Sequence, residues 1–252
     1  MKFSIITPSF NQAAFLEETI KSVISQKVDL EYFIQDGGST DGSVDIIKKY
    51  TKKYPYISWQ SKNDRGQTDA LNQGLKKCTG DIIAYLNSDD YYLPNTLEKV
   101  EKYFESNQKK SWLVGDCQVS DPKLSWTFSL KHFWPIGLSS WFLHVFNTIN
   151  QPSVFLRKDL VKKVGEFDEK LNYAFDYDYW LRCQKVAGAP GRLHSPLSVF
   201  RIQSNSKGNT SYKKQFAEDY KVIKKFTSNP VTLVLHNLGK SITELGYRSL
   251  KS

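Results

Sequence analysis

The chain of 252 residues contains few cysteines and no long apolar run. Its three cysteines, Cys78, Cys117 and Cys183, are odd in number and far apart, which argues against a disulfide framework and fits a reducing cytosol. No pair of cysteines or histidines has the close spacing of a zinc site. No stretch of about 18 residues is free of polar side chains, so we expect no membrane-spanning helix. The first apolar run, residues 3–6, is too short for the core of a signal peptide.

Motifs of several common enzyme classes are missing as well. The chain has neither the G-x-G-x-x-G loop of dinucleotide-binding proteins nor the G-x-x-x-x-G-K-[ST] loop that binds phosphates. It also lacks the G-x-S-x-G turn around a nucleophilic serine, which disfavours a Ser-His-Asp hydrolase. The histidines have no spacing that indicates a site, and each is more typical of a core or surface residue: His132, His144, His194 and His236.

Positive charge is plentiful and concentrated near the C-terminal end. The chain carries 35 Lys and Arg against 26 Asp and Glu, a formal net charge of +9. Residues 204–252 hold nine of the basic residues against three acidic ones, so most of the excess lies there. Such a segment suits nucleic acid or an anionic membrane surface, and composition alone does not choose between them.

Strand-like and helix-like segments alternate along the first part of the chain. We expect strands over residues 2–7, 30–35, 57–60 and 81–86, with helices over residues 16–24, 43–54 and 68–77 between them. This alternation predicts an α/β protein with a parallel sheet covered by helices. Ligands bind beyond the carboxyl ends of such strands, so the polar clusters after the first, second and fourth strands should converge on one crevice.

The remainder of the chain has a different composition and a less regular apolar pattern. Residues 112–150 are rich in aromatic side chains and show no regular period. Beyond them we expect strands over residues 151–156 and 197–202, and helices over residues 158–164, 177–185, 207–226 and 231–250. The expected regions are therefore an α/β half over residues 1–107, a second half over residues 108–206, and a basic helical extension over residues 207–252.

The clearest polar cluster is Asn87-Ser88-Asp89-Asp90, at the end of an apolar strand. Two adjacent carboxylates repel each other unless a cation or hydrogen-bond donors offset their charge. Oxygen ligands in such a place suit Mg²⁺ or Mn²⁺ carrying a phosphate-bearing ligand. The alternative is a solvated acidic turn before the helix that follows Pro94.

Two more clusters follow the second and third strands. Asp36 opens a glycine-rich loop whose backbone can approach a flat ligand, although an ordinary Asx turn is the alternative. Asp69 and Asn72 share one face at the start of a helix, where Asp69 can simply complement the helix dipole. Arg65 can meet a phosphate or pair with Asp64.

A carboxylate also stands at the start of a helix in the second half. Asp176 precedes Tyr177, in a segment rich in aromatic side chains. A carboxylate that faces a crevice beside an aromatic wall can have a raised pKa and act as a general base. The alternative is that Asp176 is only the N-cap of the helix.

Taken in order, these clusters resemble a known family. Five motifs carry the resemblance: Thr7-Pro8-Ser9-Phe10-Asn11, the segment Asp36–Asp41, Asp64-x-Gly66-x-x-Asp69-Ala70-x-Asn72-x-Gly74, the segment Asn87–Asp90, and Asp176-x-Asp178-x-Trp180-Leu181-Arg182. The chain is similar over residues 2–206 to a family 2 glycosyltransferase with the GT-A fold. The resemblance implies a mixed, mostly parallel central sheet flanked by helices, with a C-terminal helical extension. It also implies that residues 1–107 bind the nucleotide sugar and that residues 108–206, the other half of the same GT-A domain, bind the acceptor and supply the catalytic base.

The resemblance also implies roles for particular residues. The donor nucleotide sugar would contact Thr7, Pro8, Ser9, Asn11, Asp36, Gly38, Asp64, Gly66, Asp69, Asn72, Ser88 and Asp89. The ion, Mn²⁺ or Mg²⁺, would be held by Asp89, Asp90 and, weakly, Gln203. Asp176 would be the catalytic base, and the acceptor would contact Gln151, Asp178, Trp180 and Arg182.

Three positions depart from the family pattern. Asn87 replaces the first carboxylate of a D-x-D motif, which leaves open whether Asp89 or Asp90 binds the ion directly. Phe175 stands where a glutamate usually precedes the base. Gln203 stands where many relatives have histidine, so metal affinity is expected to be weaker.

The implied activity is inverting transfer of a hexosyl or N-acetylhexosaminyl group from a nucleotide-diphosphate sugar, with a UDP-sugar favoured. The acceptor would be a hydroxyl of a glycan or of a lipid-linked molecule in cell-surface polysaccharide synthesis. A nucleotidyltransferase is the enzyme alternative, and it would release pyrophosphate instead of a nucleoside diphosphate. A nucleic-acid-binding protein would explain the basic segment but not the acidic clusters, so we expect no nucleic-acid partner.

The basic segment also suggests where the protein works. Residues 207–225 alternate lysines with apolar side chains, as an interfacial helix does, and the aromatic stretch Trp126–Phe146 can offer a site for a lipid-linked acceptor. The alternative is that the helix packs its apolar stripe on the catalytic domain and that the aromatic residues are core. We therefore expect a cytoplasmic enzyme held peripherally at an anionic membrane surface, the inner face of the plasma membrane.

Overall fold

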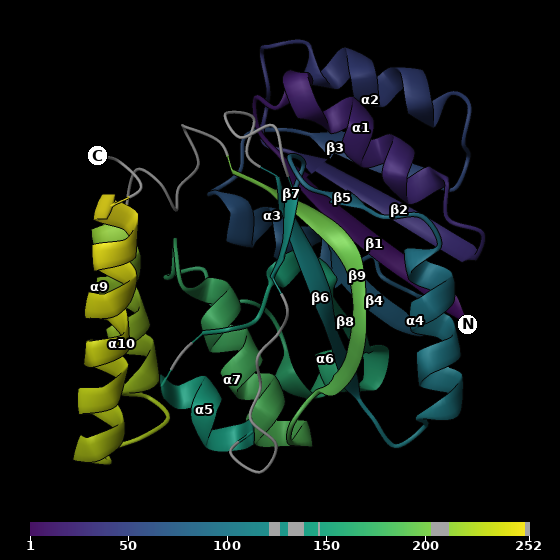
Figure 1. Ribbon diagram of the computed structural model, residues 1–252. Helices are drawn as coiled ribbons and strands as arrows, with labels where there is room; N and C mark the ends of the chain where they lie inside the picture. Colours follow the sequence, from purple (N-terminus) through teal and green to yellow (C-terminus); the bar gives the residue numbers. More distant parts are fainter. Residues whose placement is uncertain (121–126, 131–138, 146, 203–211, 250–252) are drawn as a thin grey trace.

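The computed structural model describes residues 1–120, 127–130, 139–145, 147–202 and 212–249 (Figure 1). Within them a single nine-stranded sheet runs through the molecule in the order β3-β2-β1-β4-β8-β6-β9-β5, with β7 paired to β6. The strands are β1 (Lys2–Ser9), β2 (Asp29–Asp36), β3 (Ile57–Ser61), β4 (Ile82–Tyr85), β5 (Tyr91–Tyr92), β6 (Trp112–Ser120), β7 (Thr127–Leu130), β8 (Val154–Arg157) and β9 (Gly191–Arg201).

The first four strands pair in parallel, and β8 joins them antiparallel to β4. The second half of the sheet is mixed, because β6 is parallel to β9 but antiparallel to β8 and β7. The two halves expected from the sequence therefore share one continuous sheet, and the predicted α/β architecture is confirmed.

Helices cover both faces of the sheet (Figure 1). They are α1 (Ala13–Ile24), α2 (Ser43–Thr51), α3 (Gln67–Leu75), α4 (Thr96–Ser106), α5 (Ser139–Val145), α6 (Lys158–Val164), α7 (Phe175–Ala187), α9 (Tyr212–Ile223) and α10 (Pro230–Ser249), with a 3-10 turn at Gln151–Ser153. One core contains side chains of α1, α2 and α4, and the other contains side chains of α3, α6 and α7. Successive side chains of β1 point to opposite faces of the sheet and so contribute to both cores: Ile5 packs in the first core and Ile6 in the second.

The structure corrects several expected elements. β6 lies in the stretch where the sequence showed no period, and it is buried along almost its whole length because other elements cover both of its faces. Such a strand lacks the apolar–polar alternation that reveals a half-exposed strand. Helix α1 begins at Ala13 and not at residue 16, since Asp41 of a distant loop accepts a hydrogen bond from the Ala13 N–H at 2.8 Å. The expected strand over residues 151–156 begins only at Val154, after the 3-10 turn.

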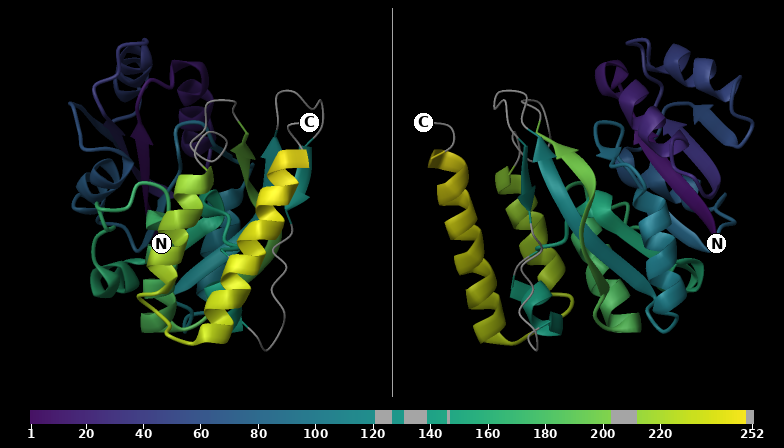
Figure 2. Two further views of the ribbon diagram at one scale, coloured as in Figure 1. Left: turned by 90° about the vertical axis from the view of Figure 1, so that its left-hand side faces the viewer. Right: turned by 45° about the vertical axis from the view of Figure 1, so that its right-hand side comes forward.

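The C-terminal helices α9 and α10 lie side by side on the outside of the molecule (Figure 2). The apolar side of α9 faces inward, and Val222 and Ile223 are fully buried in the core that contains α7. In the described part of the basic segment, Val222 and Ile223 of the apolar stripe therefore pack on the protein itself, as in the alternative that the sequence left open. No helix in the described ranges is both long and apolar enough to cross a membrane.

Candidate active site

The loops that follow β1 and β2 come together at the carboxyl ends of these neighbouring strands. The Gly37 N–H donates to the Ser9 carbonyl at 2.8 Å, and the Asn11 N–H donates to the Ser39 hydroxyl at 2.8 Å. Ser9 is 5% exposed, and its hydroxyl has no hydrogen-bond partner among the described residues. Ser9 and Asn11 therefore lie at the carboxyl end of β1, beside the loop that follows β2.

Asp36 organises the glycine-rich loop. This buried carboxylate accepts hydrogen bonds from the Gly38 and Ser39 N–H groups at 3.0 and 2.9 Å and from the Ser61 hydroxyl at 2.6 Å. Gly38 has a φ of +86°, which favours glycine. Asp36 is thus already engaged by its own loop.

Two predicted donor contacts lie below the surface of the crevice. Thr7 is fully buried within β1, where its hydroxyl accepts a hydrogen bond from the Tyr32 phenol at 2.9 Å. Pro8 is also buried in the strand. Both side chains are therefore enclosed by the fold, which does not agree with direct contact between these side chains and a nucleotide. Asp64 remains at the crevice, since a β-carbon at Gly37 would lie 3.0 Å from its Oδ2 atom.

The loop after β4 is held from three sides. The Thr19 hydroxyl of α1 donates to the carbonyls of Ser88 and Asp90 at 2.9 and 2.6 Å. Gln67 of α3 donates to the Asn87 side-chain oxygen at 2.8 Å, and the Asn87 amide donates to Gln151 at 3.1 Å. Asn87, at the first position of the expected D-x-D motif, therefore connects the donor side of the crevice with Gln151.

The two carboxylates of this loop have different environments. Asp90 is fully buried; its Oδ1 accepts a hydrogen bond from the Arg201 N–H at 3.0 Å, and its Oδ2 accepts one from Asn87 at 3.4 Å. Burial, followed by the negative charge of Asp89, holds the pKa of Asp90 well above its usual range. Asp89 remains partly exposed, and desolvation raises its pKa as well. Asp89 is thus the more accessible of the two carboxylates, whereas the burial of Asp90 does not agree with a direct ligand role.

Arg201 supplies positive charge beside this pair, which the motifs did not indicate. Its guanidinium lies 4.7 Å from the centre of the Tyr91 ring and 2.6 Å from Glu18. Its charge lowers the pKa of Asp90, against the larger effect of burial. The predicted weak ligand Gln203 follows two residues later but lies outside the described residues.

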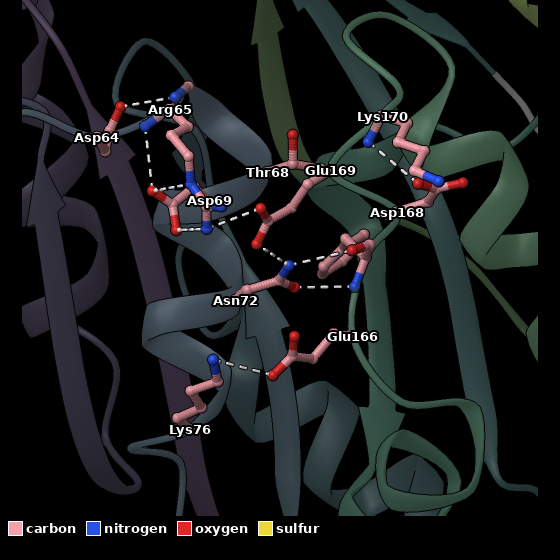
Figure 3. A network of polar contacts seen from close by, with 12 residues as sticks. Asp64, Arg65, Thr68, Asp69, Asn72, Lys76, Glu166, Asp168, Glu169 and Lys170 are labelled. Atoms are coloured by element: carbon pink, nitrogen blue, oxygen red, sulfur yellow. Dashed lines mark hydrogen bonds and ion pairs between the residues drawn. The ribbon is translucent and has the colours of Figure 1, made fainter.

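Helix α3 is joined to the segment before α7 by polar contacts (Figure 3). Arg65 pairs with Asp69 at 3.2 Å and with Glu169 at 2.8 Å. The Arg65 side chain holds the pKa of Asp69 down at about 2. Because Arg65 is 73% exposed, its guanidinium remains accessible to an anionic ligand. Sequence analysis named Arg65 and Asp69 but gave no sign of Glu169.

Asn72 does not face the crevice. The residue is 1% exposed, its Oδ1 accepts the Phe167 N–H at 2.8 Å, and its Nδ2 donates to the Phe167 carbonyl at 3.0 Å (Figure 3). Nδ2 also reaches Glu169 at 3.2 Å. These contacts correct the predicted donor role, because both polar ends of the Asn72 amide are occupied by a segment distant in sequence.

Asp176 stands in the first turn of α7 and is not its N-cap, which is Ala174. Desolvation raises the pKa of Asp176 to about 6 although part of the side chain stays open to solvent. The buried Tyr85 phenol has no hydrogen-bond partner among the described residues, and its pKa is raised by burial, then by the charges of Asp176 and Asp90. Tyr85 therefore lies within electrostatic reach of both carboxylates, which places Asp176 near the end of β4.

The predicted acceptor contacts on α7 point elsewhere. Trp180 is 1% exposed and stacks between Tyr85 and Trp112, with ring centres 6.5 and 6.3 Å apart. Asp178 is buried and pairs with Arg182 at 2.8 Å. The acceptor roles of these residues are corrected, because one turn beyond Asp176 the helix lies beneath the sheet.

About half of the aromatic stretch Trp126–Phe146 lies outside the described residues. In its described part, Leu143 is fully buried, and the Trp141 indole N–H donates to the Thr232 hydroxyl of α10 at 3.0 Å. This part of the stretch packs against the C-terminal helices.

The chain was compared with known proteins. Residues 4–162 match the family model of glycosyl transferase family 2. The chain belongs to this family. An uncharacterized glycosyltransferase of Rickettsia typhi is 26% identical over 242 residues, which cover 92% of this chain and 74% of that protein. A PGL/p-HBAD biosynthesis glycosyltransferase of Mycobacterium bovis is 28% identical over 186 residues, which cover 72% of this chain and 69% of that protein.

Solved glycosyltransferases share the fold. Staphylococcus aureus TarS, residues 1–349 in complex with UDP-GlcNAc, superposes with a TM-score of 0.70 at 21% identity over 88% of this chain. A mannosyltransferase from Pyrobaculum calidifontis, in complex with GDP-Man and Mn²⁺, superposes with a TM-score of 0.64 at 16% identity over 98% of this chain. This chain spans 65% of that TarS chain, just under two thirds of its length. These neighbours confirm the predicted GT-A fold.

The residues of this family 2 member can be tested for their fit to a divalent ion. No group of three or more His, Cys, Asp or Glu side chains within the described ranges forms a metal site by itself. Mg²⁺ is commonly bound by one or two carboxylates and completes its coordination with substrate phosphates and water. Asp89, with Asp90 behind it, supplies such a set and carries charge that a cation would offset. The carboxylate pair therefore fits an ion that binds together with a nucleoside diphosphate.

Proposed function

We propose that this glycosyltransferase transfers a sugar, with inversion, from a nucleotide-diphosphate sugar to an acceptor hydroxyl. The observation that supports the proposal is the stacking of Trp180 on Tyr85, with ring centres 6.5 Å apart, since it packs α7, one turn after Asp176, against the end of the strand that leads into the carboxylate loop. A UDP-sugar is favoured because the fold neighbour TarS binds UDP-GlcNAc, while a GDP-sugar is the second candidate because another neighbour binds GDP-Man.

Each part of the crevice has a task in this reaction. A bound Mg²⁺ or Mn²⁺ would stabilise the negative charge of the leaving nucleoside diphosphate. Asp89 would hold the ion, and the exposed guanidinium of Arg65 would contact phosphate oxygens. The unpartnered hydroxyl of Ser9 would bind the nucleoside part of the donor.

Asp176 would act on the acceptor. A sugar hydroxyl has a pKa far above 7, so it needs a base as it attacks the anomeric carbon. A carboxylate with a pKa of about 6 is ionised at neutral pH and is a stronger base than an ordinary aspartate. Because the acceptor oxygen attacks the anomeric carbon directly, no covalent enzyme intermediate is needed and the configuration inverts.

The test is an analysis of the products. The protein is incubated with UDP-GlcNAc, UDP-glucose or GDP-mannose and a panel of glycan acceptors, with Mn²⁺ or with excess EDTA, and the released nucleotide and the anomeric configuration are measured. We expect a nucleoside diphosphate, an inverted linkage and loss of turnover in EDTA. Release of pyrophosphate would instead establish a nucleotidyltransferase, and full activity in EDTA would refute the role of the ion.

We further propose that the protein attaches peripherally to an anionic membrane, where a lipid-linked acceptor would be found. The outer face of α10 exposes three apolar side chains at helical spacing: Val231 (61% exposed), Val234 (57%) and Leu238 (54%). The neighbouring helix α9 and the turn that follows it have exposed lysines at Lys213, Lys214, Lys221, Lys224 and Lys225. An apolar stripe beside cationic side chains complements an anionic lipid surface.

Flotation with liposomes tests this attachment. We expect binding to anionic vesicles but not to neutral ones, lost at high salt and in the double variant Val234→Glu, Leu238→Glu. The matched control is Val186→Glu, since Val186 is 47% exposed on α7, away from this surface. Equal recovery in the soluble fraction under all conditions would reject the attachment. A change of oligomeric state in the double variant would indicate that a second copy of the chain covers α10 instead.

A further inference from the structure

Three consecutive backbone N–H groups at the entrance to α7 point at one carboxylate of another helix. Glu218 of α9 accepts hydrogen bonds from Asn172 at 3.0 Å, from Tyr173 at 2.7 Å and from Ala174 at 3.1 Å. All three reach the same oxygen, Oε2, and the second oxygen lies 3.2 Å from the Asn172 nitrogen. Successive N–H groups that converge in this way form an anion-binding nest.

Helix α7 has no cap of its own. Its N-cap position is Ala174, and no side-chain hydrogen bond caps the helix from this position. The first N–H groups of a helix have no partner within the helix, and a negative charge is favourable at this end. Glu218 thus accepts the N–H of the N-cap residue Ala174, as the glutamate of a capping box does, but from 44 residues farther along the chain. Within the first turn, the Asp176 carboxylate accepts the Tyr177 N–H at 2.7 Å.

The chain is anchored just after Glu218, at the C-terminal end of α9. Lys225 pairs with Asp168 at 3.1 Å and with Asp178 at 3.3 Å. Val222 and Ile223 are fully buried in the shared core. The Glu218 carboxylate is therefore presented by a fixed helix, and it can hold the chain that enters α7 in one conformation.

We propose that Glu218 is a positioning residue for Asp176, so that the C-terminal helix α9 forms part of the catalytic apparatus. Asp176 comes two residues after Ala174, in the turn that begins where the Glu218 contacts end. The direction of a side chain in the first turn follows from the backbone conformation of that turn. Loss of the nest would let the turn fray and would move the Asp176 carboxylate away from the acceptor hydroxyl. The inference rests on the proposed function of Asp176.

Steady-state kinetics of Glu218→Ala and Glu218→Gln test the proposal. We expect Glu218→Ala to lower kcat about ten- to hundredfold, the cost of a misplaced catalytic group, while KM for the donor changes less than about twofold. Glu218→Gln keeps an oxygen that can accept the N–H groups and should recover part of kcat. The acid limb of the pH profile should move to lower pH in Glu218→Ala, because a frayed turn exposes Asp176 to water.

Glu166→Gln is the matched control, since Glu166 is an exposed carboxylate in the same region, 3.1 Å from Lys76 of α3. It should leave kcat unchanged. Wild-type kcat in Glu218→Ala, with only the melting temperature lowered, would refute the positioning role. If Glu218→Ala does not fold, Glu218→Gln takes its place. A wild-type kcat and pH profile in Glu218→Gln, with an equal fall of kcat in this variant and in the wild type under mild urea, would then refute the positioning role. Asp176→Asn, assayed in parallel, separates the role of Asp176 from that of Glu218. Wild-type kcat in Asp176→Asn would refute Asp176 as the base. Loss of kcat in Asp176→Asn together with wild-type kcat in Glu218→Ala would refute only the positioning role of Glu218.

Discussion

Substitution of Asn72 by alanine tests whether this residue holds the fold or binds the donor. In the structure its amide pairs with both backbone polar groups of Phe167, at 2.8 and 3.0 Å. Asn72 is 1% exposed and Phe167 is 4% exposed, so water does not readily replace the lost amide. An unsatisfied buried polar group costs about 1–3 kcal/mol. Two such groups, partly relieved by relaxation, predict that Asn72→Ala lowers the free energy of unfolding by about 2–4 kcal/mol.

Thermal unfolding measures this loss, and donor binding by calorimetry is measured on the same samples. For a chain of this size each kcal/mol lowers the melting temperature by about 2–4 °C, so we expect a fall of roughly 4–16 °C. Lys76→Ala is the control on the same helix. Its ion pair with Glu166 is exposed, at 64% and 52%, so its loss should have little effect. If Asn72→Ala melts like Lys76→Ala but no longer binds the donor, the structural role is refuted and the donor role is restored.

Three further outcomes follow from the site. Because the pKa of Asp176 is raised to about 6 and the base must be ionised, kcat at saturating donor should rise with pH through about 6 and level off above it. The variant Asp176→Asn should lower kcat at least about a hundredfold and should lose this rise of kcat with pH. Asp89→Ala should abolish Mn²⁺-dependent turnover. Its melting temperature should hold or rise, because the negative charge that raises the pKa of the buried Asp90 has been removed. A retained Mn²⁺ dependence would contradict the assignment of the ion to Asp89. Trp180→Ala should lower the free energy of unfolding, measured in urea, by about 3–5 kcal/mol. Replacement of the half-exposed Trp141 by alanine should lower it clearly less, and equal losses would contradict the core position of Trp180.

Local pattern was sufficient for much of the architecture. Apolar runs that end in polar or glycine-rich turns marked β1, β2 and β4, and helical spacing marked α1, α2 and α3. Parallel strands carry their carboxyl ends to the same edge, so the order of these elements also predicted that their following loops would meet. The position of β6 could not be predicted in this way. A central strand covered on both faces has no alternation, and aromatic residues around it suggested an irregular stretch.

The sequence by itself determined which chemical groups stand near the crevice, because a motif places them at strand ends and helix starts. It did not determine which of them face a ligand. Asn72 and Asp178 are taken up by Phe167 and by Arg182, partners whose proximity results from packing rather than spacing. Only the tertiary structure could decide these contacts, since they depend on how distant segments cover each helix. The same reason applies to Glu218, whose role at the start of α7 has no signature in the residues around it.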